Sequence, residues 1–126
     1  MIDLKQLGKS LGNAVRGIVL VFQTEQSFRL QISAAILVLV AGWFFKISHS
    51  EWLIIFVLIG AVLSFELLNS VFERIIDVFK PRLHPAVRDM KDIMAGCVLV
   101  ASLAAVVIGL YIFIPRLQIF LYPFRF

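Results

Sequence analysis

Apolar residues dominate three long stretches of the chain that contain no charged side chain. They cover residues 30–45, 52–65 and 93–115, and they are separated by the polar turn 46–51 and by the charged segment 66–92. A helix needs about 20 mainly apolar residues to cross the hydrocarbon core of a bilayer, and only the third stretch has that length by itself. Together with the residues that flank them, the stretches predict transmembrane helices over about 30–46, 52–72 and 93–115.

The ends of the first two stretches explain why their helices are expected to be longer. Arg29 and Lys46 flank the first stretch, and the long stems of these side chains let their charges lie at the membrane surface. The second stretch meets Glu66, but no glycine or proline interrupts 62–80. We therefore expect this helix to leave the bilayer and to continue in water as far as Pro81.

Residues 2–22 have the periodicity of an amphipathic helix. At 100° per residue, an arc of about 80° contains Leu4, Leu7, Leu11, Val15, Ile18 and Phe22. The opposite side carries Lys5, Lys9, Asn13 and Arg16. A basic face beside an apolar stripe is typical of a helix that lies in the membrane interface. The alternative is a helix that packs on protein, which the small soluble mass of this chain disfavours.

The composition is that of a membrane protein, and nothing divides residues 1–126 into two domains. Hydrophobic residues make up 61% of the chain and charged residues 16%, against roughly half and a quarter in soluble domains. The net charge of +4 comes from cations that flank the apolar stretches. Nucleic acid is therefore not an expected partner.

The positions of lysine and arginine predict the orientation in the membrane. Cytoplasmic loops of membrane proteins carry an excess of these residues. Nine of them precede the first span or lie between the second and third spans, whereas one lies between the first and second. We therefore expect a multi-pass protein of the bacterial inner membrane, with its N-terminus and residues 73–92 in the cytoplasm.

Four polar residues of the second span fall on one side of a helix. Glu66, Asn69, Glu73 and Asp77 are spaced by three, four and four residues, which places them within about an 80° stripe. An acid near the hydrocarbon costs several kcal/mol, roughly 2.5–3.5 at the bilayer centre. A structural acid hydrogen-bonded across helices is the alternative for Glu66 alone, but the whole stripe favours a functional site.

Charged residues before the first and third spans face the same side of the membrane. Glu25 and Arg29 are one turn apart, and Lys91 and Asp92 are adjacent. Carboxylates suit Mg²⁺ together with phosphate oxygens, a lysine suits phosphate, and Glu66 suits deprotonation of a lipid hydroxyl. These are the parts of a phosphoryl transfer site, although no glycine-rich nucleotide motif of soluble kinases occurs.

Three motifs resemble those of the prokaryotic diacylglycerol kinase family, over about residues 7–115. The strongest runs from Glu66 through Asn69 and Glu73 to Asp77, and a second begins at Lys91-Asp92 and includes Ala95. The third runs from Glu25 to Arg29. His84-Pro85 and other local features are more similar to the undecaprenol kinase branch.

The resemblance implies an all-α homotrimer of subunits with a surface helix and three spans, and with sites shared between subunits. It assigns Glu66 as the general base and Glu25 and Glu73 as Mg²⁺ ligands. It implies that the ATP site contains Glu25, Glu73, Asp77, Lys91 and Asp92. The lipid site would contain Arg29, Gln31, Glu66, Asn69 and Ala95.

We therefore expect an ATP-dependent lipid kinase that acts at the cytoplasmic face of the membrane. The acceptor is undecaprenol or diacylglycerol, and the sequence favours undecaprenol modestly. The alternative of another class is a non-enzymatic carrier or assembly protein, in which Glu66 would handle ions. That alternative does not explain why Lys91, Asp92 and Glu25 are expected on the same side of the membrane.

Overall fold

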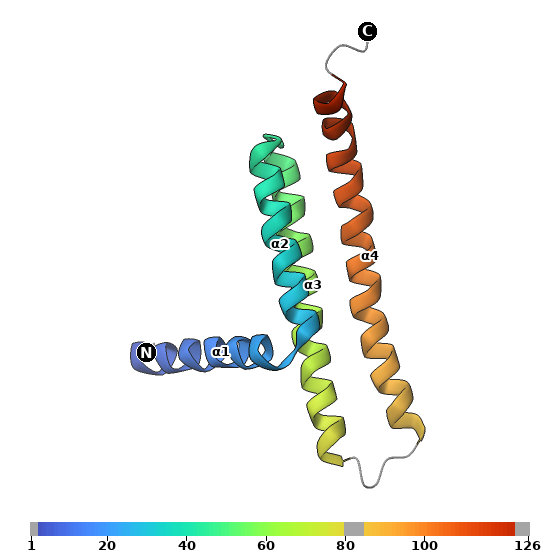
Figure 1. The fold of residues 1–126 in the computed structure, drawn as a ribbon. Helices are drawn as coiled ribbons and strands as arrows, with labels where there is room; N and C mark the ends of the chain where they lie inside the picture. Colours follow the sequence, from blue (N-terminus) through green and yellow to red (C-terminus); the bar gives the residue numbers. More distant parts are fainter. Residues whose placement is uncertain (1–2, 80–84, 123–126) are drawn as a thin grey trace.

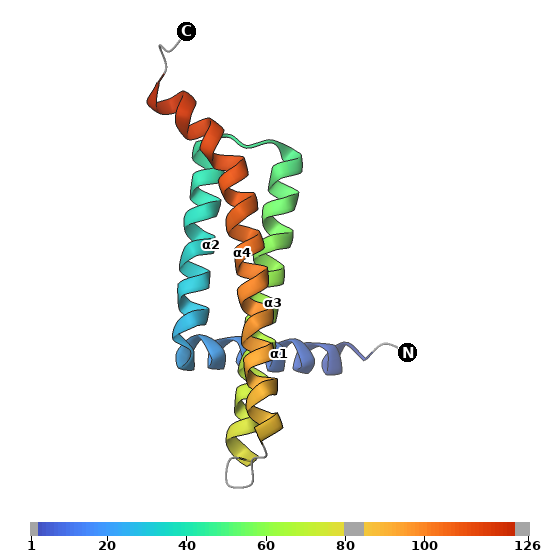
Figure 2. The same cartoon turned by 90° about the vertical axis from the view of Figure 1, so that its right-hand side faces the viewer.

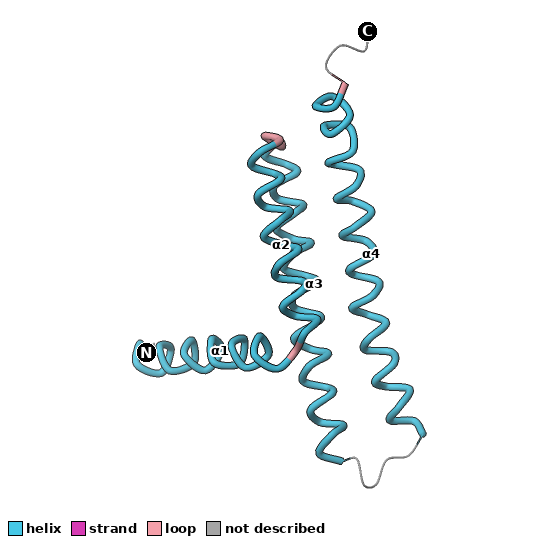
Figure 3. Tube along the Cα trace, in the orientation of Figure 1, coloured by secondary structure: helices cyan, strands magenta, loops and turns pink. Residues whose placement is uncertain are grey.

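The computed structural model describes residues 3–79 and 85–122 (Figure 1). Its four helices are α1 (Leu4–Thr24), α2 (Gln26–Phe44), α3 (His49–Phe79) and α4 (Pro85–Leu121). The described residues contain helices and short connections but no strand (Figure 3). The prediction of an all-α fold is therefore confirmed.

Three of the helices are long and apolar enough to cross a membrane, namely α2, α3 and α4. At 1.5 Å per residue, their 19, 31 and 37 residues give lengths of about 28, 46 and 55 Å. The hydrocarbon core is roughly 30 Å thick, so α2 matches it, whereas α3 and α4 are longer. Figure 1 shows that both continue past the level of α1, which runs crosswise to them. Figure 2 shows α2 and α3 next to each other with α4 in front of them, and Figure 1 shows the same α4 to one side of the pair.

A single residue separates α1 from α2. The polar segment 23–29 predicts a longer connection, but only Glu25 lies outside a helix, with an extended backbone at φ −104° and ψ 119°. The Arg29 guanidinium stabilises this arrangement, because Nη1 donates to the carbonyl oxygens of Phe22 and Gln23 at 3.0 and 3.1 Å. Those carbonyls belong to the last turn of α1, where no backbone N–H of the same helix is available to bind them.

α3 begins earlier than the predicted span, because its first turn is capped. The backbone N–H of Ser48 donates to Glu51 Oε2 at 2.7 Å, and the Glu51 N–H donates to Ser48 Oγ at 3.4 Å. These reciprocal bonds form a capping box, for which Ser-x-x-Glu is the sequence signature. The sequence places Glu51 in a polar turn, and the structure corrects this by placing it in the helix.

α4 extends beyond the predicted span at both ends. It begins at Pro85, whose fixed φ suits a first helical position, and it passes through Pro115 to end at Leu121. Beside Pro115, Arg116 Nη1 donates to the Ile112 carbonyl at 2.6 Å, and Nη2 contacts Glu51 Oε2 at 2.6 Å. Pro81, where the second membrane helix is expected to end, lies outside the described residues.

Val21, Phe28 and Ile76 are buried toward the α1 end of the helices, and a separate apolar cluster lies at the opposite end. Ile47, Ile55 and Ile112 are buried there, with Phe45 and Trp52 packed against them. Most large apolar side chains of α2, α3 and α4 are exposed instead. Such an exterior suits a lipid solvent rather than water.

Candidate active site

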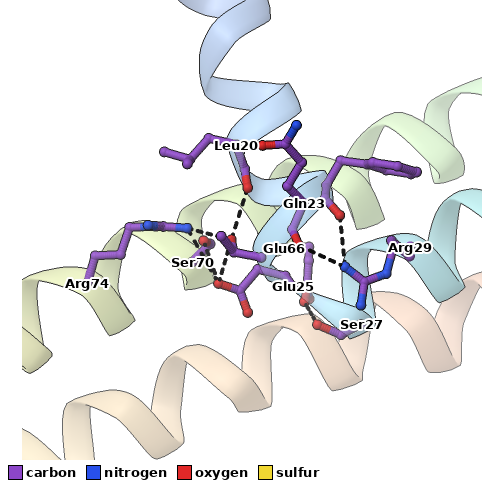
Figure 4. A network of polar contacts seen from close by, with 10 residues as sticks. Leu20, Gln23, Glu25, Ser27, Arg29, Glu66, Ser70 and Arg74 are labelled. Atoms are coloured by element: carbon purple, nitrogen blue, oxygen red, sulfur yellow. Dashed lines mark hydrogen bonds and ion pairs between the residues drawn. The ribbon is translucent and has the colours of Figure 1, made fainter.

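The buried carboxylate of Glu66 is the centre of a polar cluster between α2 and α3 (Figure 4). It is 4% exposed and accepts a hydrogen bond from the Ser27 hydroxyl and one of 3.0 Å from Gln31 Nε2. Ser27 and Gln31 are one turn apart, so they project from the same face of α2. Burying a carboxylate is costly, and these two donors offset part of that cost.

Glu25 lies at the elbow, by which we mean residues 24–27, where the end of α1 meets the start of α2. Its Oε1 accepts hydrogen bonds of 3.4 Å from both Thr24 Oγ1 and Ser70 Oγ, and it lies 3.7 Å from Arg74 Nη2. Ser70 is buried one turn beyond Glu66. Residues 66, 70 and 74 of α3 therefore all contact the elbow (Figure 4).

Glu73 and Lys91 join α3 to α4 on the other side of the same region. Glu73 Oε1 and Lys91 Nζ are 3.6 Å apart, and both side chains are partly open to solvent. Asp77, one turn beyond Glu73, and Asp92, adjacent to Lys91, are exposed. The predicted acids and lysine therefore lie on the parts of α3 and α4 nearest residues 80–84.

Two buried polar atoms beside these groups have no hydrogen-bond partner among the described residues. They are Gln31 Oε1 and Asn69 Oδ1. Buried polar atoms are seldom left unpaired, so each of these two acceptors marks a place where a donor is missing. Ala95 is exposed on α4, one turn after Lys91, and no polar contact ties it to the cluster.

An apolar groove of about 390 Å³ opens between α2, α3 and α4. Gln31 lies at its wall, so the amide that donates to Glu66 also contacts the groove. Small residues from α2 and α4 widen it, namely Ala34, Ala35, Ser102, Ala105 and Gly109. The groove has the apolar lining that a lipid chain needs, and the Gln31 amide at its wall can fix the polar end of that chain.

The acidic side chains of the site suit a Mg²⁺ ion that is bound jointly by protein carboxylates and substrate phosphates. No three His, Cys, Asp or Glu side chains among the described residues are close enough to hold a metal ion by themselves. Mg²⁺ in phosphoryl transfer sites is usually bound by one or two carboxylates plus substrate phosphates and water. Glu25 and Glu73 are 26% and 32% exposed, so both carboxylates are accessible for such a role.

The sequence prediction missed Ser27, Ser70, Thr24 and Arg74, which hold the predicted acids in place. A signal for two of them is present, because 66, 70 and 74 repeat every four residues and so lie on one side of α3. Their significance depends on the position of the elbow, which the sequence pattern leaves undefined.

Comparison with known proteins gives a consistent family assignment. Residues 12–113 match the model of the prokaryotic diacylglycerol kinase family. The chain is 40% identical over 115 residues to the undecaprenol kinase of Bacillus subtilis (strain 168), covering 91% of this chain and 94% of that protein. It is 30% identical over 105 residues to a diacylglycerol kinase of Synechocystis sp., covering 80% of this chain and 58% of that protein.

These matches confirm the resemblance that the motifs indicate, and they favour an enzyme over a non-enzymatic carrier. Together with three helices that can each cross a bilayer, they describe a multi-pass membrane protein. The chain belongs to the prokaryotic diacylglycerol kinase family of lipid kinases.

Proposed function

We propose that this chain transfers the γ-phosphoryl group of ATP to the hydroxyl of a membrane lipid alcohol, with Glu66 as the general base. The proposal is carried by the buried Glu66 carboxylate, which shares Gln31 with the apolar groove. A lipid chain in the groove would bring its hydroxyl to the end where Gln31 and Glu66 meet. A general base must lie within hydrogen-bond distance of the proton that it removes.

The names of the relatives suggest two acceptors for this reaction. The Bacillus subtilis relative is named for undecaprenol and is more similar to this chain than the Synechocystis relative, which is named for diacylglycerol. We therefore propose undecaprenol as the main acceptor and diacylglycerol as the alternative.

The chemistry follows from the positions of the chain's own groups. Glu66 takes the hydroxyl proton while the lipid oxygen forms a bond to the γ-phosphorus, and the bond from that phosphorus to the bridging oxygen of ADP breaks. Ser27 and Gln31 keep the carboxylate oriented. Asn69 Oδ1 has no hydrogen-bond partner in the described part of the chain, which supports a role for this residue beside the substrates. Arg29 already binds the last carbonyls of α1, so its proposed contribution to the lipid site includes holding the elbow.

The proposed nucleotide site lies on the exposed parts of α3 and α4. Lys91 supplies positive charge for phosphate, and Asp77 and Asp92 hold the rest of the nucleotide. Mg²⁺, with Glu25 and Glu73 as its protein ligands, would neutralise negative charge on the phosphates. Most of the rate enhancement then comes from positioning and charge neutralisation rather than from covalent chemistry.

The membrane placement is part of the proposal. Leu4, Leu11 and Val15 of α1 are 77%, 61% and 59% exposed, which supports an apolar face buried in the membrane interface. The cations of α1 and of the α3–α4 end support a cytoplasmic location for this end. The exposed apolar surfaces of the three longer helices support assembly into the homotrimer with shared sites that the resemblance implies.

The test is phosphate transfer from γ-labelled ATP by the purified protein in mixed micelles. Undecaprenol and diacylglycerol are offered separately, each with and without Mg²⁺. We expect Mg²⁺-dependent labelling of undecaprenol above that of diacylglycerol. Label mainly on diacylglycerol would reverse the acceptor preference, and no label on either lipid by folded protein would refute the kinase proposal for these acceptors.

A further inference from the structure

Arg74 is a cation of the candidate site to which neither the resemblance nor the relatives' names give a role. It extends from α3 to the elbow, where Nη2 donates to Thr24 Oγ1 at 2.6 Å and lies 3.7 Å from Glu25 Oε1 (Figure 4). Its side chain is 42% exposed. All its polar contacts with described residues involve Nη2, so the Nε and Nη1 donors have no protein partner among them.

The charge of the proposed site calls for a further cation. The set assigned by resemblance contains five carboxylates but two cations, Arg29 and Lys91. Lys91 is already paired with Glu73, and Arg29 is bound to backbone carbonyls. A nucleotide triphosphate carries several negative charges, so this set by itself would repel it at short range. A bound Mg²⁺ offsets part of this repulsion and leaves a requirement for fixed positive charge.

Arg74 has the position and the chemistry to meet that requirement. The two proposed metal ligands are Glu73 and Glu25. Arg74 follows Glu73 in the sequence and contacts Glu25. A guanidinium presents five N–H donors in a planar fork that binds phosphate through two parallel hydrogen bonds. We propose that Arg74 is a further nucleotide-binding residue, whose Nε and Nη1 donors bind phosphate oxygens of ATP while Nη2 stays at the elbow. This inference rests on the proposed kinase function.

The competing explanation is that Arg74 only braces the elbow. Its bond to Thr24 links α3 to the last residue of α1, and losing that link would lower stability and could disturb the site indirectly. The two roles differ in a measurable way. If Arg74 only braces the elbow, replacing Thr24 or Arg74 should lower nucleotide affinity to the same extent. If Arg74 binds phosphate, replacing Arg74 should lower nucleotide affinity more than replacing Thr24.

The experiment measures the Kd for the Mg²⁺ complex of a non-hydrolysable ATP analogue by calorimetry, with full-length protein in detergent micelles. It compares Arg74→Gln, Arg74→Lys and Thr24→Val with the wild type, and Arg16→Gln is the control for an equal loss of charge on α1. The melting temperature without nucleotide measures how much each contact stabilises the elbow. Comparison of KM for ATP with kcat shows whether a variant affects nucleotide binding or the chemical step.

We expect Arg74→Gln to weaken nucleotide binding by about 10- to 100-fold, the usual range for a lost hydrogen bond between charged groups. KM for ATP should rise in parallel, with a smaller effect on kcat and on KM for the lipid. Arg74→Lys keeps the charge but loses the fork, so its Kd should be intermediate. Thr24→Val removes the brace and one hydrogen bond to Glu25, so its loss of affinity should be clearly smaller than that of Arg74→Gln. Arg16→Gln should bind nucleotide within about twofold of the wild type.

Three results would overturn the inference. They are an unchanged Kd in Arg74→Gln, an equal loss of affinity in Thr24→Val, or an equal loss in Arg16→Gln. If Arg74→Gln fails to fold, Arg74→Lys decides, and a Kd equal to that of the wild type refutes phosphate binding. Failure of the wild type itself to bind the nucleotide analogue would instead refute the proposed function.

Discussion

Replacement of Glu66 by glutamine separates the chemical role of this side chain from its structural role. The carboxylate accepts from Ser27 and from Gln31 Nε2, and glutamine keeps one oxygen acceptor at nearly the same volume. The new amide N–H can donate to Gln31 Oε1 once the Gln31 side chain turns over, because that oxygen has no partner among the described residues. Ser27 is exposed at its position on α2, so its hydroxyl can reorient.

The two expected magnitudes therefore differ widely. Two hydrogen bonds are then present, and the Gln31 amide nitrogen takes the position of the unpaired Gln31 oxygen, so the number of unpaired buried groups is unchanged. The free energy of unfolding should therefore change by no more than about 1 kcal/mol. Loss of a general base typically costs 10²- to 10⁴-fold in rate, which is about 3 to 5 kcal/mol in the activation barrier. By contrast, Glu66→Leu leaves the buried Gln31 donor unpaired and should cost about 1 to 3 kcal/mol of stability as well.

The assay combines labelled phosphate transfer in mixed micelles with thermal unfolding and nucleotide affinity for the same preparations. We expect Glu66→Gln to unfold and to bind Mg²⁺-nucleotide as the wild type does, with kcat lower by at least 100-fold. A variant that keeps a tenth or more of the wild-type kcat would refute the base assignment. One that loses stability by several kcal/mol would refute the reasoning on hydrogen-bond exchange.

Further predictions concern the metal, the groove and the far end of the helices. Glu73→Gln removes a proposed Mg²⁺ ligand and the partner of Lys91, so the Mg²⁺ concentration for half-maximal activity should rise by about tenfold or more, and an unchanged Mg²⁺ titration would contradict the ligand role. Ala105→Phe fills the groove and should raise KM for the lipid without changing the Kd for nucleotide; equal KM values would show that the groove does not hold the lipid chain. Glu51→Ala removes the side-chain half of the α3 capping box and the ion pair with Arg116, and it should lower stability by about 2 kcal/mol. Glu51→Gln keeps an oxygen acceptor for the Ser48 N–H and should lose about half as much in detergent melts. Equal losses in the two variants would show that the ion pair carries all of the effect.

Much of the fold follows from local signals, because each helix depends on residues close to it in sequence. The spans are readable from uncharged stretches, and the continuation of α3 past Glu66 follows from the lack of a helix breaker. The start of α3 could also have been predicted, since Ser48 and Glu51 have the spacing of a capping box. The passage of α4 through Pro115 is harder to predict, because it involves Arg116 and the distant Glu51.

The candidate site is predictable only in part, for a physical reason. The stripe from Glu66 to Asp77 is a property of one helix and follows from spacing. The contacts of Glu25 with Ser70 and Arg74 depend on how α1 and α2 meet α3, which is a tertiary property. The sequence therefore indicates which acids matter but does not indicate which neutral or basic side chains orient them.

The one-residue connection at Glu25 has a mechanical consequence for an enzyme that works at a fluctuating surface. The 21 residues of α1 form a lever of about 31 Å, and its pivot is at the proposed metal ligand. A rotation of about 5° around this pivot would move the far end of α1 by roughly 3 Å, by the same helical length, while Glu25 itself would hardly move. A tilt of α1 that leaves the Arg29 and Arg74 contacts at the elbow intact would therefore displace Leu4 far more than Glu25.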